Sequence, residues 1–217
     1  MRIFLCELIP LVFFCFANVV TVKISKKGFG FSMPVTMVVT ALVLYISQFV
    51  FNTFKVVYVL LAAGCALGVI LVFLKKKDKE FIGRNLSAGF IAFLAIYLVF
   101  AIVDYKRCII GWDEISHWCK MVKEMLRLDS FYSVAESDVI VHKDYPPLVS
   151  IFEMLFCKLM GGYSEAACTL ALHIITMTFL IPPLADYAKA GKENVLKNIA
   201  ISGFLLVSFI LVIGSLD

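Results

Sequence analysis

Residues 56–74 read VVYVLLAAGCALGVILVFL, a run without a single charged side chain. About 18 to 20 apolar residues in a helix are long enough to cross the roughly 30 Å hydrocarbon core of a bilayer. Inside that core, only helices and closed barrels satisfy the hydrogen bonds of the backbone. The run therefore predicts a membrane-spanning helix and indicates the fold class of the whole chain.

Further apolar runs lie on both sides of this one. They are Ile3–Val22, Pro34–Phe51, Leu86–Val103, Ala167–Pro183 and Ile199–Ile213. Together with a hydrophobic content of 62%, they predict an all-α, polytopic transmembrane helix bundle with six crossings. Glu7 interrupts the first run and only Arg2 precedes it, so we expect a retained helix rather than a cleaved signal peptide.

A polar stretch, Asp104–Tyr145, separates the early runs from the late ones. We therefore expect four helices in residues 1–103, an external loop region in 104–163 and two further helices in 164–217. Short basic clusters, which stay in the cytoplasm, follow the first and third helices. This rule predicts that the amino terminus and the long loop lie on the extracytoplasmic side, and we expect a multi-pass protein of the plasma membrane. The clusters are Lys23, Lys26 and Lys27, then Lys75, Lys76, Lys77, Lys79 and Arg84.

The path of residues 147–160 is open. About 14 residues span roughly 21 Å as a helix, which is too short for a crossing. A crossing would also put the basic loop around Lys192 outside, against the charge rule. We prefer a helix that lies on, or dips into, the outer surface. Because the basic residues behind the net charge of +4 lie at helix ends, we expect no nucleic-acid partner.

The loop contains a concentration of polar and aromatic residues, Gly111–Trp118. Asp113, Glu114, His117 and both tryptophans of the chain lie within seven residues. Ionisable groups at a membrane boundary are costly to desolvate and commonly functional. Acidic residues also suit the first turn of a helix, because the helix dipole favours negative charge there. A functional and a purely structural interpretation are about equally supported.

From Asp113 onward the spacing predicts an amphipathic helix of about four turns, suited to the membrane interface. Its apolar side is Ile115, Trp118, Cys119, Val122, Met125 and Leu126, and its polar side is Glu114, His117, Lys120, Lys123, Glu124 and Arg127. A second polar cluster, His142-Lys143-Asp144-Tyr145, precedes a Pro-Pro pair that favours a helix start. Alone, these are solvated loop groups; beside the acidic pair, they would wall a pocket above the membrane.

The remaining candidates have simpler interpretations. None of the seven cysteines has a CxxC or metal-ligand spacing, so we expect no metal site. Cys108 and Cys119 could pair in an oxidising space, although two unpaired thiols are the simpler expectation. A histidine such as His173, inside an apolar run, most often bonds a neighbouring helix. Gly64 and Gly68 have the spacing that seats a close helix neighbour, here within one bundle rather than between two chains.

The order of these loop elements resembles the GT-C superfamily of integral-membrane glycosyltransferases, which includes protein O-mannosyltransferases and lipid A aminoarabinose transferases. The resemblance covers residues 99–184. It implies transfer of a sugar from a polyprenyl-phosphate donor to an acceptor at the outer membrane face. The elements are Asp113-Glu114, the amphipathic helix, Tyr145-Pro146-Pro147-Leu148 and Gly161-Gly162-Tyr163-Ser164-Glu165.

The resemblance also implies roles for single residues. Asp113 matches the catalytic aspartate that takes the proton of the acceptor hydroxyl. Glu114 matches the neighbour that positions the acceptor or a divalent cation, so a cation requirement is open. The leaving phosphate needs fixed cations, for which the loop offers several lysines and arginines. The substrate-binding candidates are His117, Lys120, Arg127, His142, Lys143, Asp144 and Tyr145.

Two departures from the family leave alternatives open. Ser164–Leu172 lacks the arginine that many members have there, and members usually continue well beyond the point where this chain ends. We therefore expect the amino-terminal portion of an enzyme, a half that needs a partner subunit, or an inactive fragment. The alternative function is a non-catalytic membrane partner or flippase subunit in cell-envelope glycan assembly. Few polar residues interrupt the helices, which favours the enzyme; a lipid-linked sugar and membrane lipids are the expected partners.

Overall fold

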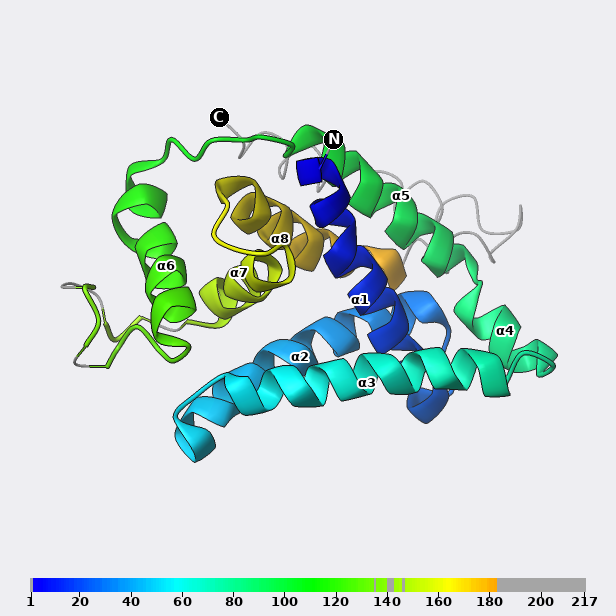
Figure 1. Cartoon of the computed structure of the whole chain (residues 1–217). Coiled ribbons are helices and arrows are strands. Elements are labelled where there is room, and N and C mark those ends of the chain that lie inside the picture. The colour runs from blue at the N-terminus through cyan, green and yellow to red at the C-terminus, as the bar shows by residue number, and fades with distance from the viewer. Residues whose placement is uncertain (1, 135, 140–142, 146, 183–217) are drawn as a thin grey trace.

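The computed structural model describes residues 2–134, 136–139, 143–145 and 147–182. Over this part of the chain it consists of helices and turns without strands, which confirms the all-α prediction (Figure 1). The helices are α1 (Arg2–Ser25), α2 (Phe29–Phe51), α3 (Lys55–Leu74), α4 (Lys79–Asn85), α5 (Ala88–Val103), a π-helical turn (Glu114–Trp118), α6 (Cys119–Leu128), α7 (Leu148–Leu159) and α8 (Glu165–Thr178).

Four helical stretches are long and apolar enough to cross a membrane. They correspond to the four early apolar runs, and the fourth stretch combines α4 with α5. The fifth expected crossing is shorter than predicted, because α8 has 14 residues and ends at Thr178. The sixth, Ile199–Ile213, lies outside the described residues. The stretches are Leu5–Ser25, Phe29–Phe51, Lys55–Leu74 and Lys79–Val103.

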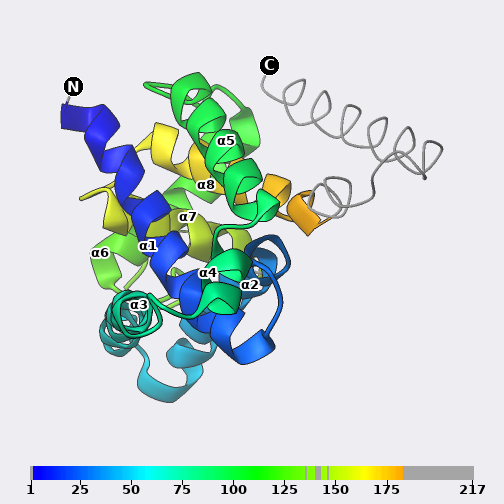
Figure 2. The ribbon, with the colours of Figure 1, turned by 90° about the vertical axis from the view of Figure 1, so that its right-hand side faces the viewer.

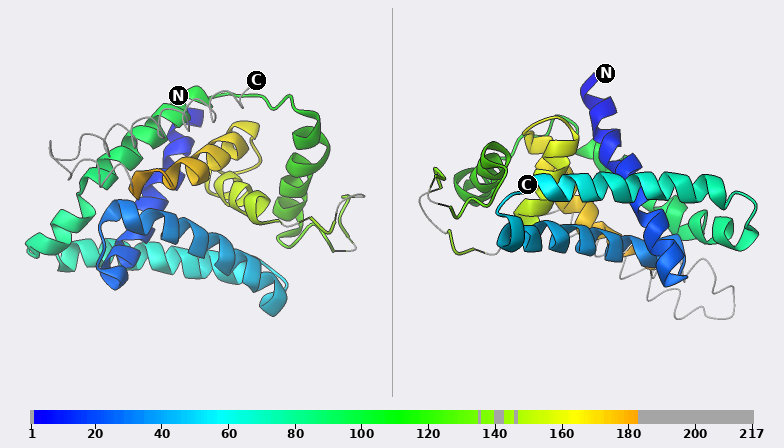
Figure 3. Two further views of the ribbon diagram at one scale, coloured as in Figure 1. Left: turned by 180° about the vertical axis from the view of Figure 1, so that it is seen from behind. Right: turned by 60° about the horizontal axis from the view of Figure 1, so that its bottom comes forward.

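α3 lies at the edge of the bundle, where Figure 2 shows it nearly along its axis beside α1 and α2. Only Val57 and Gly68 of this helix are buried, and large apolar side chains such as Phe73 are open to the surroundings. α2 and α3 run side by side, as the right-hand view of Figure 3 shows. An apolar helix with so much open surface is what a lipid-facing position requires.

α1 and α3 approach each other closely at Gly68. A Cβ atom added to Gly68 would lie 2.0 Å from the backbone oxygen of Phe16, whereas one added to Gly64 would meet nothing within 4 Å. Small residues allow the backbones of two membrane helices to approach. The expected close packing within the bundle is therefore present at Gly68, and Gly64 takes no part in it.

Replacing Gly68 with Ala is expected to lower the free energy of unfolding by about 1–3 kcal/mol, because the added methyl group must push two backbones apart. The matched variant Gly64→Ala is expected to be neutral or to stabilise the protein by up to about 1 kcal/mol, since Ala favours the helix. Thermal unfolding of the purified variants in detergent measures both effects. Equal unfolding temperatures for the two would contradict this helix crossing.

The connections of the helices gather at two ends of the bundle. Gln48 Oε1 accepts hydrogen bonds from Ser130 Oγ (3.0 Å) and the Phe131 amide (3.1 Å), so the long loop lies against the end of α2. At the other end of α2, Arg84 Nη1 donates to the Lys26 carbonyl (3.3 Å) and joins the first connection to the third. The first and third connections therefore lie at one end of α2, and the long loop lies at the other.

α7 lies at the centre of the bundle. It is short, as predicted, with 12 residues, but it packs on α1, α2, α6 and α8. Phe152 and Phe156 are fully buried, and their ring centroids lie 5.5 Å and 5.8 Å from that of Phe14 on α1. The helix therefore dips into the bundle and does not lie on its surface, because its side chains are apolar almost all round.

Candidate functional site

The cluster Gly111–Trp118 begins the predicted amphipathic helix. The Ile115 amide donates to the Gly111 carbonyl (3.0 Å), and the π-turn Glu114–Trp118 continues directly into α6. The predicted helix is confirmed, although its first turn is wider than an α-helical turn. Such π-turns are rare and occur frequently at functional sites.

Asp113 lies at the open start of this helix. Its side chain is exposed, as are those of Trp112 (80%) and Ile115 (55%). Ile115, expected on the apolar side, precedes α6 and is not packed on protein as Met121, Val122 and Met125 are. Ser116 Oγ forms a hydrogen bond with His117 Nδ1. Glu114 belongs to the π-turn, but its side chain lies outside what the structure describes.

The second polar cluster meets the first through two aromatic rings. The ring centroids of Trp118 and Tyr145 lie 5.7 Å apart at an interplanar angle of 32°. The Tyr132 hydroxyl donates to the Tyr145 carbonyl (2.6 Å) and fixes the backbone there. Two motifs at opposite ends of the loop are thus brought together. His142 lies outside the described residues.

The other members of the second cluster point elsewhere. Lys143 Nζ donates to the Val134 carbonyl of the same loop (3.3 Å), and the Asp144 side chain is exposed. On α6, Lys120 is exposed as well. Of the predicted substrate-binding residues, the structure therefore brings Tyr145 to the π-turn that contains His117. Lys143 instead binds the backbone of its own loop.

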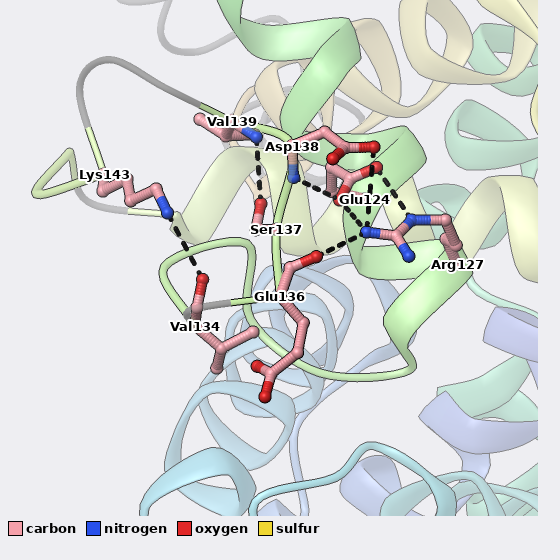
Figure 4. Close-up of polar contacts among 8 residues, drawn as sticks. All are labelled: Glu124, Arg127, Val134, Glu136, Ser137, Asp138, Val139 and Lys143. Atoms are coloured by element: carbon pink, nitrogen blue, oxygen red, sulfur yellow. Dashed lines mark hydrogen bonds and ion pairs between the residues drawn. The ribbon is translucent and has the colours of Figure 1, made fainter.

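Arg127, also a predicted substrate-binding residue, clamps the loop onto α6 (Figure 4). Its Nη2 donates to Glu124 Oε2 (2.6 Å) and to the Glu136 carbonyl (2.7 Å), and its Nε donates to Glu124 Oε1 (3.1 Å). The Asp138 amide also donates to Glu124 Oε2 (2.9 Å). Glu124, expected on the polar side, is only 7% exposed. This correction has a clear reason, since the bidentate pair and the amide compensate for its burial.

The clamp predicts an acid-sensitive loop. Hydrogen bonds from the Arg127 guanidinium hold the pKa of the Glu124 carboxyl below its usual value. A group whose pKa is lowered by folding contributes stability above its unfolded pKa, about 4.3, and loses it as the pH falls through the folded pKa. We expect the protection of the Asp138 amide, measured against the intrinsic exchange rate at each pH, to fall below about pH 4. In Glu124→Gln this protection should be low at neutral pH too; strong protection there would contradict the clamp.

The apolar side of α6 packs on protein. Met121, Val122 and Met125 are fully buried, and α6 contacts α7. The left-hand view of Figure 3 shows α6 at the side of the bundle, next to α7. The face that the sequence assigns to the membrane interface is therefore used to attach the loop to the helical core.

A buried polar cluster, which the sequence analysis did not assemble, lies where α5 ends beside α8. Asp104 Oδ2 is 2.7 Å from His173 Nδ1, and Arg107 Nη1 is 3.7 Å from Asp104 Oδ1. Asp104 and His173 are 1% and 3% exposed. The expectation that His173 bonds a neighbouring element is confirmed. The sequence did contain a signal for this cluster, because Asp104 directly follows one apolar run and His173 lies within another.

Glu7 on α1 belongs to the same region. It is 2% exposed, and neither carboxylate oxygen has a hydrogen-bond partner among the described residues. Asp104 acts on it electrostatically, and the Tyr97 hydroxyl donates to the Glu7 backbone oxygen (2.6 Å). Burying ionisable groups inside a membrane bundle costs free energy, so finding several of them together is a reason to expect a function there.

The described side chains contain no group of three or more His, Cys, Asp or Glu placed to hold a metal ion. All seven cysteines are free. Cys108 is exposed and Cys119 buried, so the pairing left open by the sequence is not formed. Cys157 and Cys168 approach most closely, with their sulfur atoms 3.6 Å apart.

The site thus consists of an exposed aspartate at a π-turn, an aromatic pair that joins two distant motifs, and a clamped loop. Comparison of the chain with protein-family models finds no match, and comparisons with curated proteins and with solved structures find none either.

Proposed function

We propose that the protein is a membrane glycosyltransferase of the GT-C type, or the amino-terminal portion of one. It would transfer a sugar from a polyprenyl phosphate to an acceptor at the membrane surface. The observation that carries the proposal is the contact between Trp118 and Tyr145, 5.7 Å between ring centroids, because it brings the π-turn that follows Asp113 to the tyrosine of the second cluster. The four apolar helices support it, since they suit a lipid-linked substrate.

In this proposal Asp113 is the general base. Its exposed carboxylate takes the proton of the acceptor hydroxyl, the acceptor oxygen bonds to the anomeric carbon, and the bond from that carbon to the phosphate oxygen breaks. The polyprenyl phosphate leaves with the electron pair. The partly exposed rings of Trp118 and Tyr145 offer apolar faces on which the C–H groups of a sugar can pack.

The geometry ranks the cationic candidates for the leaving phosphate. Lys120 is exposed and lies seven residues beyond Asp113, about 10 Å along a helix. Arg127 lies about 21 Å away by the same measure, and its guanidinium is bound to Glu124. Lys120 is therefore the better candidate, and Arg127 holds the loop.

The test uses the purified protein in vesicles that contain a polyprenyl phosphate carrying a radiolabelled sugar. A cell-envelope extract supplies acceptors. We expect protein-dependent release of the label from the lipid phosphate into a new glycoside. Binding of the labelled lipid without any release would contradict the transferase proposal.

The second candidate is a non-catalytic membrane partner or flippase subunit. One observation favours it: Glu7, Asp104 and His173 are buried between helices, where a polar path would need such groups. The same vesicles distinguish the two candidates. A flippase subunit would move the labelled lipid between leaflets and leave the bond between sugar and phosphate intact.

A further inference from the structure

Two hollows of the surface adjoin at one residue, Lys158. The first is an apolar groove of about 500 Å³ between α1, α3 and α7. The second, also about 500 Å³, is a basic pocket formed by the ends of α6 and α7 and the turn after α7. Lys158 lines both, so an apolar hollow and a basic hollow lie next to each other.

The apolar groove follows one face of α3. Its lining residues on this helix recur at three- and four-residue steps from Tyr58 to Val69, about 17 Å along the axis. Ala62, Cys65 and Ala66 lie in the middle of that face, and their small side chains leave the hollow open. Phe13 of α1 and Leu155 of α7 form its walls. The shape suits one extended hydrocarbon chain in a helix that faces lipid.

The basic pocket carries three cations and no acidic lining residue. They are Lys123, Arg127 and Lys158. Gly161 and Gly162 have positive φ values of 95° and 153°, and an added Cβ at either would meet nothing within 4 Å, so the turn leaves the pocket open.

The cations also have partners inside the protein. Lys158 Nζ lies 3.5 Å from Asp129 Oδ1, and Arg127 binds Glu124. Cations at the carboxyl ends of helices are favourable without any ligand. However, Glu124 and Asp129 do not line the pocket, and the Lys123 ammonium lies over the Tyr163 ring (4.4 Å). An anion in the pocket would therefore be nearer to the three cations than to the carboxylates.

The pocket is too far from Asp113 to share its chemistry. Lys123 lies ten residues beyond Asp113, about 15 Å along the helix, which exceeds the reach of one sugar phosphate. We propose that the adjoining hollows bind a membrane phospholipid with an anionic phosphate head group. Its acyl chain lies in the groove along α3, and its phosphate lies at Lys123, Arg127 and Lys158. This site is independent of the proposed transferase function.

Native mass spectrometry of the purified 217-residue chain in detergent tests the proposal, with phosphatidylglycerol and phosphatidylcholine as probes. We expect one phosphatidylglycerol to bind more tightly than phosphatidylcholine. Lys158→Gln should weaken phosphatidylglycerol binding about fivefold, since one basic residue near an anionic lipid contributes roughly that factor. The control Lys79→Gln, on the exposed surface of α4, should bind like the unmodified protein.

A second pair of variants probes the groove without changing any charge. Ala66→Phe should fill the groove and abolish tight binding, whereas Ala63→Phe, exposed on α3 but outside the groove lining, should not. Equal affinity for both phospholipids, or unchanged binding by Ala66→Phe, would overturn the proposal. Stoichiometric displacement of phosphatidylglycerol by polyprenyl phosphate would also overturn it, because the site would then belong to the lipid carrier.

Discussion

Replacing Asp113 with Asn is expected to lower the rate of sugar transfer by about 10²–10⁴-fold, the contribution of a positioned general base. Asn has nearly the same shape as Asp but cannot accept the proton of the acceptor hydroxyl at neutral pH. Because the Asp113 side chain is exposed, the substitution should leave the unfolding temperature unchanged. The vesicle assay with a radiolabelled polyprenyl-phosphate sugar measures the loss.

The matched control for this prediction is Glu136→Gln. Glu136 is also an exposed acidic residue of the same loop, and its backbone carbonyl, which the substitution retains, accepts the Arg127 bond. We expect this variant to transfer sugar at the unmodified rate. Comparable transfer by both variants would show that Asp113 is not the base, whatever the rest of the loop does.

The largest effect on stability is expected for Asp104→Ala. The substitution removes the carboxylate that lies 2.7 Å from His173 Nδ1 and leaves a buried imidazole without this partner. Removing one member of a buried pair costs about 3–5 kcal/mol. Denaturant or thermal unfolding in detergent measures the change, and Asp113→Asn is the exposed control with an expected change within about 0.5 kcal/mol.

The double variant Asp104→Leu with His173→Leu separates the pair from simple loss of packing. Replacing both partners of a buried polar pair with apolar groups is often close to neutral. We therefore expect the double variant to be clearly more stable than Asp104→Ala. A double variant as unstable as the single one would mean that the two side chains do not interact.

Hydropathy predicted the early helices because the bilayer imposes a simple rule. An uncharged run such as residues 56–74 must form a helix to satisfy its backbone, and α3 has nearly the same bounds as that run. The fate of residues 147–160 was harder to predict. Their length argued against a crossing, and a short apolar helix can lie on a surface or in a core. Only the neighbours of α7, which come from distant segments, decide between the two.

The candidate site shows the same division between local and distant effects. The spacing of apolar residues after Asp113 predicted α6, because amphipathicity is a local pattern. It did not predict that Glu124 would be buried, since the burial depends on a guanidinium one turn away and on the backbone of Asp138 across the loop. The pair of Asp104 and His173 joins residues 69 positions apart, and neither position alone indicates its partner.

The direct test of the claim that the two polar motifs form one site is a cross-link between positions 118 and 145. Trp118→Cys and Tyr145→Cys are combined in a chain whose other cysteines are replaced by Ser or Ala. A second chain that carries Lys75→Cys and Asp78→Cys, whose native side chains are exposed and lie 3.9 Å apart, serves as the positive control. The structure predicts that bifunctional thiol reagents link positions 118 and 145, because the native rings are in contact, with their centroids 5.7 Å apart. Efficient linking of the control pair, with none between positions 118 and 145, would contradict the account.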